Sequence, residues 1–429
     1  MTTFVMPLQP VQRWLHPVAI ASSALVLGWI LASPPAMAGG GVLANHAASD
    51  RGIYPPPKVP RPGYMETYTD PSFGFSVTRV TGESGQPTGC GNKWRKESTH
   101  HYNSMPAWNA DGSVLLIKRP AVFLDGQTYD PVCLHRPPTG DSNWHPTDPD
   151  LMIYVKDDRL ALWNVRTGQS TTFGKFDGYA KLEMGRNNRS LLSNDGRFIT
   201  LQAEKHGQRL AFVYDVINGK RYSEIPFPDG FDQAQGSSLG NYVIISRAGR
   251  IRNIYDRDGQ LVGSYDALKH IDTAIDGNGN EVIVGIRNRR PERPDDPPRG
   301  SIVMVELSSA RPTTLMDQGV GNHASARNIR SAGWTVISYD SARPPFDKEV
   351  VAVALDGSGQ LVRLAHHYSH LYTYHNEPHA NISPDGSKVI FASNWGIDGP
   401  TSAYVIDIGG HEVKASDFGR LHEVSATSL

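Results

Sequence analysis

The chain has 429 residues, and its 42 basic and 43 acidic side chains give a formal net charge of −1. A charge this close to zero provides no extended positive field for nucleic acid, and it leaves any recognition of anions to local groups. Two cysteines are too few for the paired-cysteine zinc modules. No P-loop, GxSxG elbow, dinucleotide fingerprint or HExxH motif occurs, so the sequence supports neither a nucleotide cofactor nor a serine triad.

Residues 1–38 have the pattern of a signal peptide. Arg13 precedes an apolar run, 18–32, that falls short of the roughly 20 residues needed to span a bilayer. Ala36 and Ala38 fit the small-x-small pattern that signal peptidase cleaves. Cleavage after Ala38 would give a periplasmic or secreted protein that has no membrane contact and that we expect to be a monomer. The alternative is an uncleaved anchor helix.

The segment that follows, 39–63, is rich in Gly, Ala and Pro and predicts a linker, with the folded domain spanning 64–429. Cys90 and Cys133 both lie in the exported part of the chain, and an oxidising compartment favours a disulfide between them. Such a bond should stabilise the fold by roughly 4 kcal/mol in the chain-entropy model. The alternative is a pair of free buried thiols.

A recurring unit provides the strongest information on the fold. In each copy, a turn of Asp-Gly or Asn-Gly type precedes a β-branched and aromatic run, which is typical of a β-hairpin. Seven copies, two of them degenerate and one with an Asp-Pro-Asp turn, occur at 109–119, 145–155, 193–202, 238–247, 277–286, 331–340 and 383–393.

The spacing of roughly 40 to 55 residues between copies matches a four-stranded propeller blade. No segment of comparable length shows sustained helical periodicity. We therefore predict an all-β fold, a single β-propeller of seven blades with four antiparallel strands each. The strand at 73–82 precedes the first copy and is expected to pair with the last blade, which would close the ring.

The first strand of each blade should line the central channel, so residues just upstream of the turns should meet in space. Polar and ionisable side chains occupy these places in all seven copies. They are His100 and His101; His145; Arg186 and Arg189; Gln233 and Gln235; His270 and Asp272; His323 and Arg327; and His375, Glu377 and His379. The alternative is an ordinary polar channel whose side chains are satisfied by backbone carbonyls and water.

Alternation along an extended chain would put His375, Glu377 and His379 on one side, and His323 from the preceding blade could complete a metal site. Imidazole and carboxylate ligands suit Mn²⁺ or Zn²⁺, and Ca²⁺ is a further candidate. A hydrogen-bonded His/Glu network without metal is the alternative.

The block HANISPDGSKVIFASNWG resembles the Asp-Gly repeats of TolB-like propellers and, more specifically, the secreted β-propeller polysaccharide lyases typified by oligogalacturonate lyase. HHYNSMPAWNADGS, LLSNDGRFITL and NHASARNIRSAGWTVIS extend the resemblance. Those lyases have a Gln-x-x-His-Pro-His metal motif before the last turn. Here Pro378-His379 matches its end, whereas Glu377 stands in place of the first His and Tyr374 in place of the Gln.

The resemblance implies β-elimination on an acidic, uronic-acid-containing polysaccharide or oligosaccharide. It implies a base at His101, His270 or His323, and Arg327 or a metal to offset the substrate carboxylate. Tyr372 or Tyr374 would protonate the leaving oxygen or stack on a sugar. Expected substrate-binding residues are His100, His145, Arg186, Tyr372, Asn394 and Trp395.

Two other functions stay open at this point. A non-catalytic propeller that binds a periplasmic protein or glycan needs a polar channel but no convergent base and cation. A metal-dependent hydrolase or esterase could use the same metal site to activate water.

Overall fold

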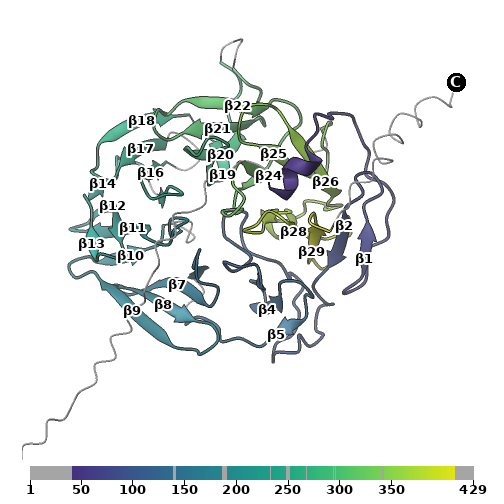
Figure 1. Ribbon diagram of the computed structural model, residues 1–429, viewed down its shortest axis with the longest axis horizontal. Helices are drawn as coiled ribbons and strands as arrows, with labels where there is room; N and C mark the ends of the chain where they lie inside the picture. The colour runs from purple at the N-terminus through teal and green to yellow at the C-terminus, as the bar shows by residue number, and fades with distance from the viewer. Residues whose placement is uncertain are drawn as a thin grey trace, which may run out of the picture. The chain divides into compact units, whose positions relative to one another are not determined.

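The computed structural model describes residues 41–138, 142–185, 191–231, 233–247, 252–266, 268–292, 294, 296–339 and 343–410. The predicted signal peptide and Arg186 lie outside these residues. In the described part of the chain the strands form seven antiparallel sheets arranged as a ring (Figure 1). The predicted all-β, seven-bladed propeller is confirmed.

Each sheet is one blade, and the blades follow one another in chain order. The first three blades contain β3 (Val114–Ile117), β4 (Val122–Asp125) and β5 (Pro131–Val132); β6 (Ser142–Trp144), β7 (Leu151–Lys156), β8 (Arg159–Asn164) and β9 (Ser170–Lys175); and β10 (Lys181–Glu183), β11 (Phe198–Lys205), β12 (Gln208–Asp215), β13 (Lys220–Arg221) and β14 (Ile225–Pro226). In blade 1 an isolated bridge between Trp108 and Leu115 adds an inner segment.

The next three blades are regular four-stranded sheets. They contain β15 (Gln233–Gly236), β16 (Tyr242–Ser246), β17 (Arg252–Asp256) and β18 (Leu261–Tyr265); β19 (Leu268–Ile275), β20 (Glu281–Arg287), β21 (Ile302–Glu306) and β22 (Pro312–Met316); and β23 (His323–Ser325), β24 (Trp334–Tyr339), β25 (Glu349–Ala354) and β26 (Leu361–His366). Blade 7 contains β27 (Asn381–Ile382), β28 (Lys388–Ser393) and β29 (Ser402–Asp407), joined by β2 (Ser76–Arg79) and β1 (Thr67–Thr69).

The seven turn motifs each lead into the second strand of a blade: β3, β7, β11, β16, β20, β24 and β28. A side chain before the turn ties it to that strand: Ser383 Oγ accepts the Lys388 N–H at 3.0 Å, and Ser193 Oγ accepts the Phe198 N–H at 2.8 Å. Gly386 has a φ of 77°, a conformation that glycine adopts without steric cost. Local turn chemistry therefore defines the blades.

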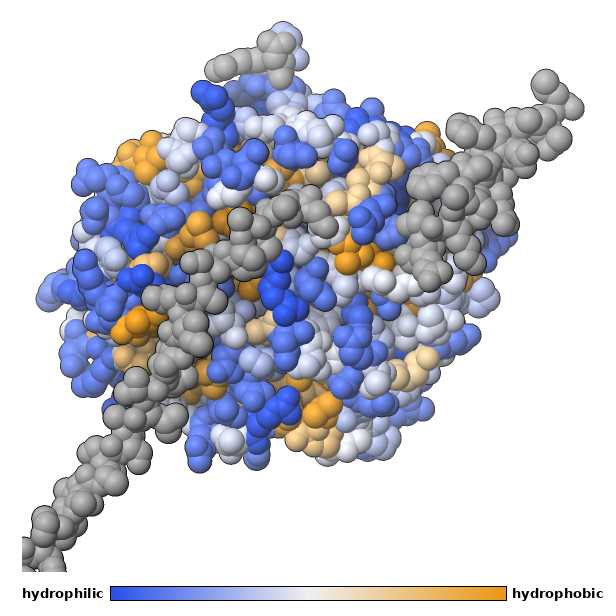
Figure 2. Space-filling model, viewed as in Figure 1, coloured by the Kyte–Doolittle hydropathy of each residue, from blue (hydrophilic) through white to orange (hydrophobic). Residues whose placement is uncertain are grey.

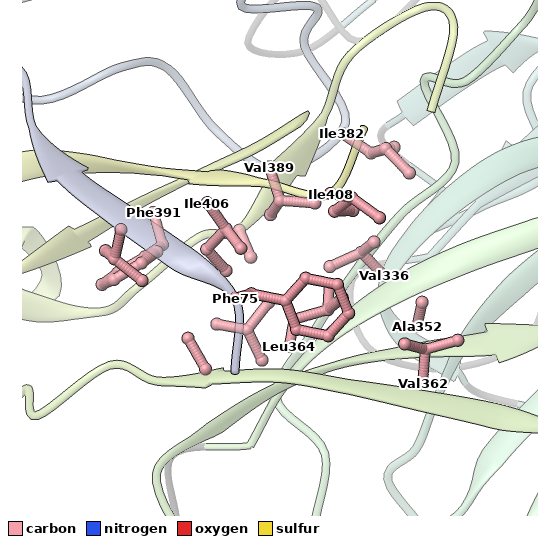
Figure 3. Close-up of a cluster of buried hydrophobic side chains, with 14 of the residues drawn as sticks. Phe75, Val336, Ala352, Val362, Leu364, Ile382, Val389, Phe391, Ile406 and Ile408 are labelled. Atoms are coloured by element: carbon pink, nitrogen blue, oxygen red, sulfur yellow. The ribbon is translucent and has the colours of Figure 1, made fainter. Parts of the chain in front are cut away.

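The N-terminal strand closes the ring, as predicted. β2 pairs antiparallel with β29, from Ser76 opposite Asp407 to Arg79 opposite Tyr404. Figure 3 shows Phe75, just before β2, among aliphatic side chains of blades 6 and 7. Phe75 is 3% exposed, so closure buries a large apolar side chain as well as the strand edge.

The predicted linker lies against blade 6. Leu43, in the 3₁₀ helix η1 (Val42–His46), is 2% exposed, and Ala48 forms a β-bridge with Leu361 of β26. The guanidinium of Arg363 also donates to the carbonyl of Gly52 at 2.7 Å. Residues 41–63 therefore pack on the propeller through side-chain and backbone contacts that composition does not reveal.

Cys90 and Cys133 form a disulfide, which confirms the predicted pairing. Polar residues cover most of the face shown in Figure 2, with smaller hydrophobic patches between them. Among the described residues, no helix has the length and apolar character needed to cross a membrane.

Candidate metal centre

Three inner strands and one inner segment bring the candidate site together. His270 lies in β19, His323 is the first residue of β23, His379 precedes β27 by two residues, and Tyr102 lies before the inner segment of blade 1. The inner strands β19, β23 and β27 contact one another in sequence around the ring. We call the end where inner strands begin the start end, and the opposite end, with the turn motifs, the turn end.

His323, Glu377 and His379 present three donor atoms that lie within 4.8 Å of one another. Glu377 Oε2 is 3.4 Å from His323 Nε2 and 3.2 Å from His379 Nε2. Two ligands about 2.1 Å from one metal ion lie about 3.0–3.4 Å apart at angles between square and tetrahedral. The donor set therefore fits a divalent transition metal, with three ligands from the chain.

The backbone directs two of the histidines into this cluster. His270 and His379 have φ values of 51° and 45°, in the left-handed region that non-glycine residues seldom adopt. The pairing of β19 with β20 also shifts register between Lys269 and Asp272, which is a β-bulge at His270. Bulges redirect side chains, and such strained residues concentrate at functional sites.

Tyr102 lies at the centre of the cluster, although the sequence predictions did not include it. It is 7% exposed, and its hydroxyl is 2.6 Å from His270 Nδ1. Its ring centroid lies 5.4 Å from that of His323 and 5.3 Å from that of His379. The signal available in the sequence was its position two residues after His100, on the same side of an extended segment.

His100 and His101 flank this cluster as neutral imidazoles. Burial lowers the pKa of His100 to about 4, and its Nε2–H donates to the carbonyl of His379 at 2.8 Å. Burial, together with nearby Lys118, lowers the pKa of His101 to about 3. His101 Nδ1 accepts the backbone N–H of Tyr102 at 2.7 Å. His100 therefore holds the backbone of His379 through this hydrogen bond.

The loop that carries Glu377 is held by two buried asparagines. Asn376, the last residue of the 3₁₀ helix η3 (Tyr374–Asn376), donates to Thr401 Oγ1 at 2.7 Å. Asn394 Oδ1 accepts the His370 N–H at 2.8 Å, and its amide donates back to the His370 carbonyl at 3.0 Å. Asn394, expected to bind substrate, is fully buried and holds this loop instead.

Trp395 also lies away from the cluster. Its indole N–H donates to the carbonyl of Val59 at 2.9 Å, and its ring packs 4.4 Å from that of Tyr368. Trp395 is 9% exposed, so the structure places it in the contact between the N-terminal segment and blade 7.

Arg327 and His145 lie at the turn end. The Arg327 guanidinium forms a buried, two-pronged ion pair with Asp272 at 2.7 and 2.9 Å, and it also donates to the carbonyl of Thr273. Burial raises the pKa of Asp272 to about 6, against the opposing effect of Arg327. His145 accepts the Asp148 N–H at its own turn and lines, with Arg327, a small cavity near the turn motifs. Both predicted residues come just after an inner strand, whereas the metal donors lie at or before the start of one. The length of the inner strands therefore separates the two groups.

His375, predicted as a ligand, is not in the three-donor group among the described residues. Its Nε2 lies 3.3 Å from Nη1 of Arg119, which is exposed on the hairpin between β3 and β4. Tyr374 packs against His379, with ring centroids 4.7 Å apart, and remains 53% exposed. Tyr372 is 54% exposed. An exposed aromatic and cationic rim therefore borders the three donors.

The fold and this geometry define a seven-bladed β-propeller with a candidate metal centre at the start end of its inner strands. The chain is similar in structure to an oligogalacturonate lyase in complex with manganese, at 16% identity and a TM-score of 0.57, over 83% of this chain and 98% of that one. It is also similar to an oligogalacturonate lyase from Vibrio parahaemolyticus, at 15% identity and a TM-score of 0.56, over 80% and 96% of the two chains. At such identities the likeness establishes the shared fold. No protein-family model and no curated protein sequence matches the chain.

Proposed function

We propose that this protein is an exported polysaccharide lyase that cleaves a uronic-acid-containing polysaccharide or oligosaccharide by β-elimination. The observation that carries the proposal is the convergence of His323, Glu377 and His379 beside the hydrogen-bonded pair of Tyr102 and His270. The likeness in fold to a lyase complexed with manganese supports it. The disulfide between Cys90 and Cys133 supports export.

His323, Glu377 and His379 would hold the divalent cation. Glu377 stands where the lyase motif has its first His, and its carboxylate provides an oxygen ligand suited to Mn²⁺. When bound, the cation would offset the charge of the substrate carboxylate and so stabilise the carbanion that forms next to it. Arg327 is not needed for this task, because its guanidinium is already paired with Asp272.

His270 is the best-placed base of the three histidines considered. His323 is a metal donor, and His101 uses its Nδ1 to accept a backbone N–H. His270 Nδ1 faces the hydroxyl of Tyr102. When Nδ1–H donates to that oxygen, Nε2 is the unprotonated nitrogen and can accept a proton. A base at His270 therefore requires the tautomer in which Tyr102 accepts this hydrogen bond.

The elimination moves one proton from the substrate to His270 and one from Tyr374 to the leaving oxygen. His270 Nε2 takes the proton from C5, the C5–H electron pair forms the C4–C5 double bond, and the bond from C4 to the glycosidic oxygen breaks. The leaving oxygen takes a proton from the phenol of Tyr374, which is exposed next to His379. The leaving oxygen stays on the anomeric carbon of the other fragment, so the products are an unsaturated uronate end and a new reducing end, and exchange with solvent removes the proton from His270 and restores that of Tyr374.

The test is the ultraviolet absorbance of unsaturated uronate while the mature protein acts on a panel of uronic-acid polysaccharides, with and without a chelator. We expect an absorbance rise that the chelator abolishes and Mn²⁺ restores. The variants H270A, H323A and H379A should each lose this activity, whereas R330Q, at an exposed arginine beside the carbonyl of Asp111 at the turn end, should keep it. A flat trace across the panel would favour the binding propeller, and water-dependent cleavage without absorbance would favour the hydrolase.

A further inference from the structure

A cluster of aromatic side chains stands exposed beside the metal donors. The cluster belongs to the segment from Leu371 to Tyr374, which we call the shelf. Leu371, Tyr372 and Tyr374 are 40%, 54% and 53% exposed. His370 stacks on Tyr372, with ring centroids 4.2 Å apart and planes inclined by 27°. Large apolar side chains grouped in this way on a surface indicate a binding site.

Hydrogen bonds hold the backbone of the shelf in place. Asn394 fixes the backbone of His370, and Thr373 N–H donates to Asn376 Oδ1 at 3.0 Å. Asn376 is in turn anchored to Thr401 in blade 7. A tyrosine held in this way provides broad contact area at small entropic cost, because few of its rotatable bonds remain to be ordered.

Blade 1 adds positive charge to the same rim. Arg119 is exposed, contacts His375 at 3.3 Å, and forms no ion pair with any carboxylate in the described part of the chain. Lys118 is close enough, with Arg119, to lower the pKa of His101. The planar guanidinium of Arg119 has donors left for a carboxylate, which arginine binds in a two-pronged manner.

We infer that Tyr372 and Arg119 form a saccharide subsite for the unit next to the one at the metal centre. Tyr372 would stack on the pyranose ring, and Arg119 would bind the carboxylate of that unit. This inference rests on the proposed function for the ring at the metal centre. It adds that two residues outside the metal centre, Tyr372 and Arg119, recognise the neighbouring unit.

The test measures binding without turnover. Metal-stripped mature protein is titrated by calorimetry with galacturonate, with its trimer, and with the monomer and trimer of mannuronate. We expect at least one trimer to bind about tenfold or more tightly than its monomer, the size of effect that a charge-assisted contact provides. R119Q and Y372A should each lose most of this gain without weakening monomer binding. Raising the salt concentration should reduce the gain in the wild type more than in R119Q.

R330Q is the matched control, because Arg330 is exposed at the turn end, where its guanidinium contacts the carbonyl of Asp111. Three results would overturn the subsite. The tighter binding of the trimer could persist in R119Q and Y372A, it could be lost equally in R330Q, or it could be absent for both trimers. If the wild type catalyses elimination and R119Q binds the trimer as tightly as the wild type does, the subsite alone would be overturned. A trimer gain lost in R119Q, in a protein without chelator-sensitive elimination, would overturn the lyase and leave the subsite intact.

Discussion

The buried pair of Asp272 and Arg327 separates a structural role from a catalytic one. The two side chains are 3% and 6% exposed, and removing one partner would leave an uncompensated charge between blades 5 and 6. Breaking such a pair costs about 3–5 kcal/mol, whereas replacing both partners by apolar residues is often close to neutral. We therefore expect R327M and D272L each to destabilise the protein by this amount, and the double variant to regain much of it.

The effect can be expressed as a melting temperature. About 370 residues from Gly41 to Gly410, with an unfolding entropy near 2.1 cal/mol/K each, convert about 3–5 kcal/mol into a decrease of about 4–6 °C. Differential scanning calorimetry of the wild type, both single variants and the double variant forms a double-mutant cycle. A fall in kcat for R327M with an unchanged melting temperature would refute this reasoning and return Arg327 to the catalytic residues.

Two further perturbations test the metal centre and the ring closure. Because Glu377 provides the one carboxylate among the three donors, E377Q should weaken Mn²⁺ binding by at least about 100-fold in a calorimetric titration. E292Q, at an exposed glutamate, should leave Mn²⁺ binding unchanged. An affinity for Mn²⁺ in E377Q equal to that of the wild type would exclude this metal site. F75A should destabilise the protein by about 3–5 kcal/mol in denaturant unfolding, because Phe75 fills the core between blades 6 and 7. I53A, at a side chain that is 66% exposed, is the control, and similar stability in F75A would show that closure does not depend on this side chain.

Several features could be predicted from sequence because they depend on neighbouring residues. A turn such as Ser383 to Gly386 contains its own hydrogen-bond acceptors and the glycine that its backbone requires. Seven such turns at blade-length intervals therefore indicated the fold. The short spacing of Glu377 and His379 likewise predicted two neighbouring donors, which the structure joins to His323.

Other features depended on contacts between blades. Tyr102 reaches His270 across 168 residues of sequence, and the bulge that turns His270 toward it has no local signature. Arg327 carries a charge that suits a substrate carboxylate, yet its guanidinium forms an ion pair with Asp272 from another blade. Arg119 was not among the predicted residues, because nothing near it in sequence relates it to His375.

The sequence by itself thus determined the number of blades and the kinds of side chain placed on the inner strands, since turn chemistry and strand alternation are local properties. Only the tertiary structure decided which of those side chains meet. A separation of four residues, as between His323 at the start of β23 and Arg327 just after it, moves a group from the start end to the turn end. Closure of the ring, which sets blades 1, 5, 6 and 7 against one another, assembles the candidate site.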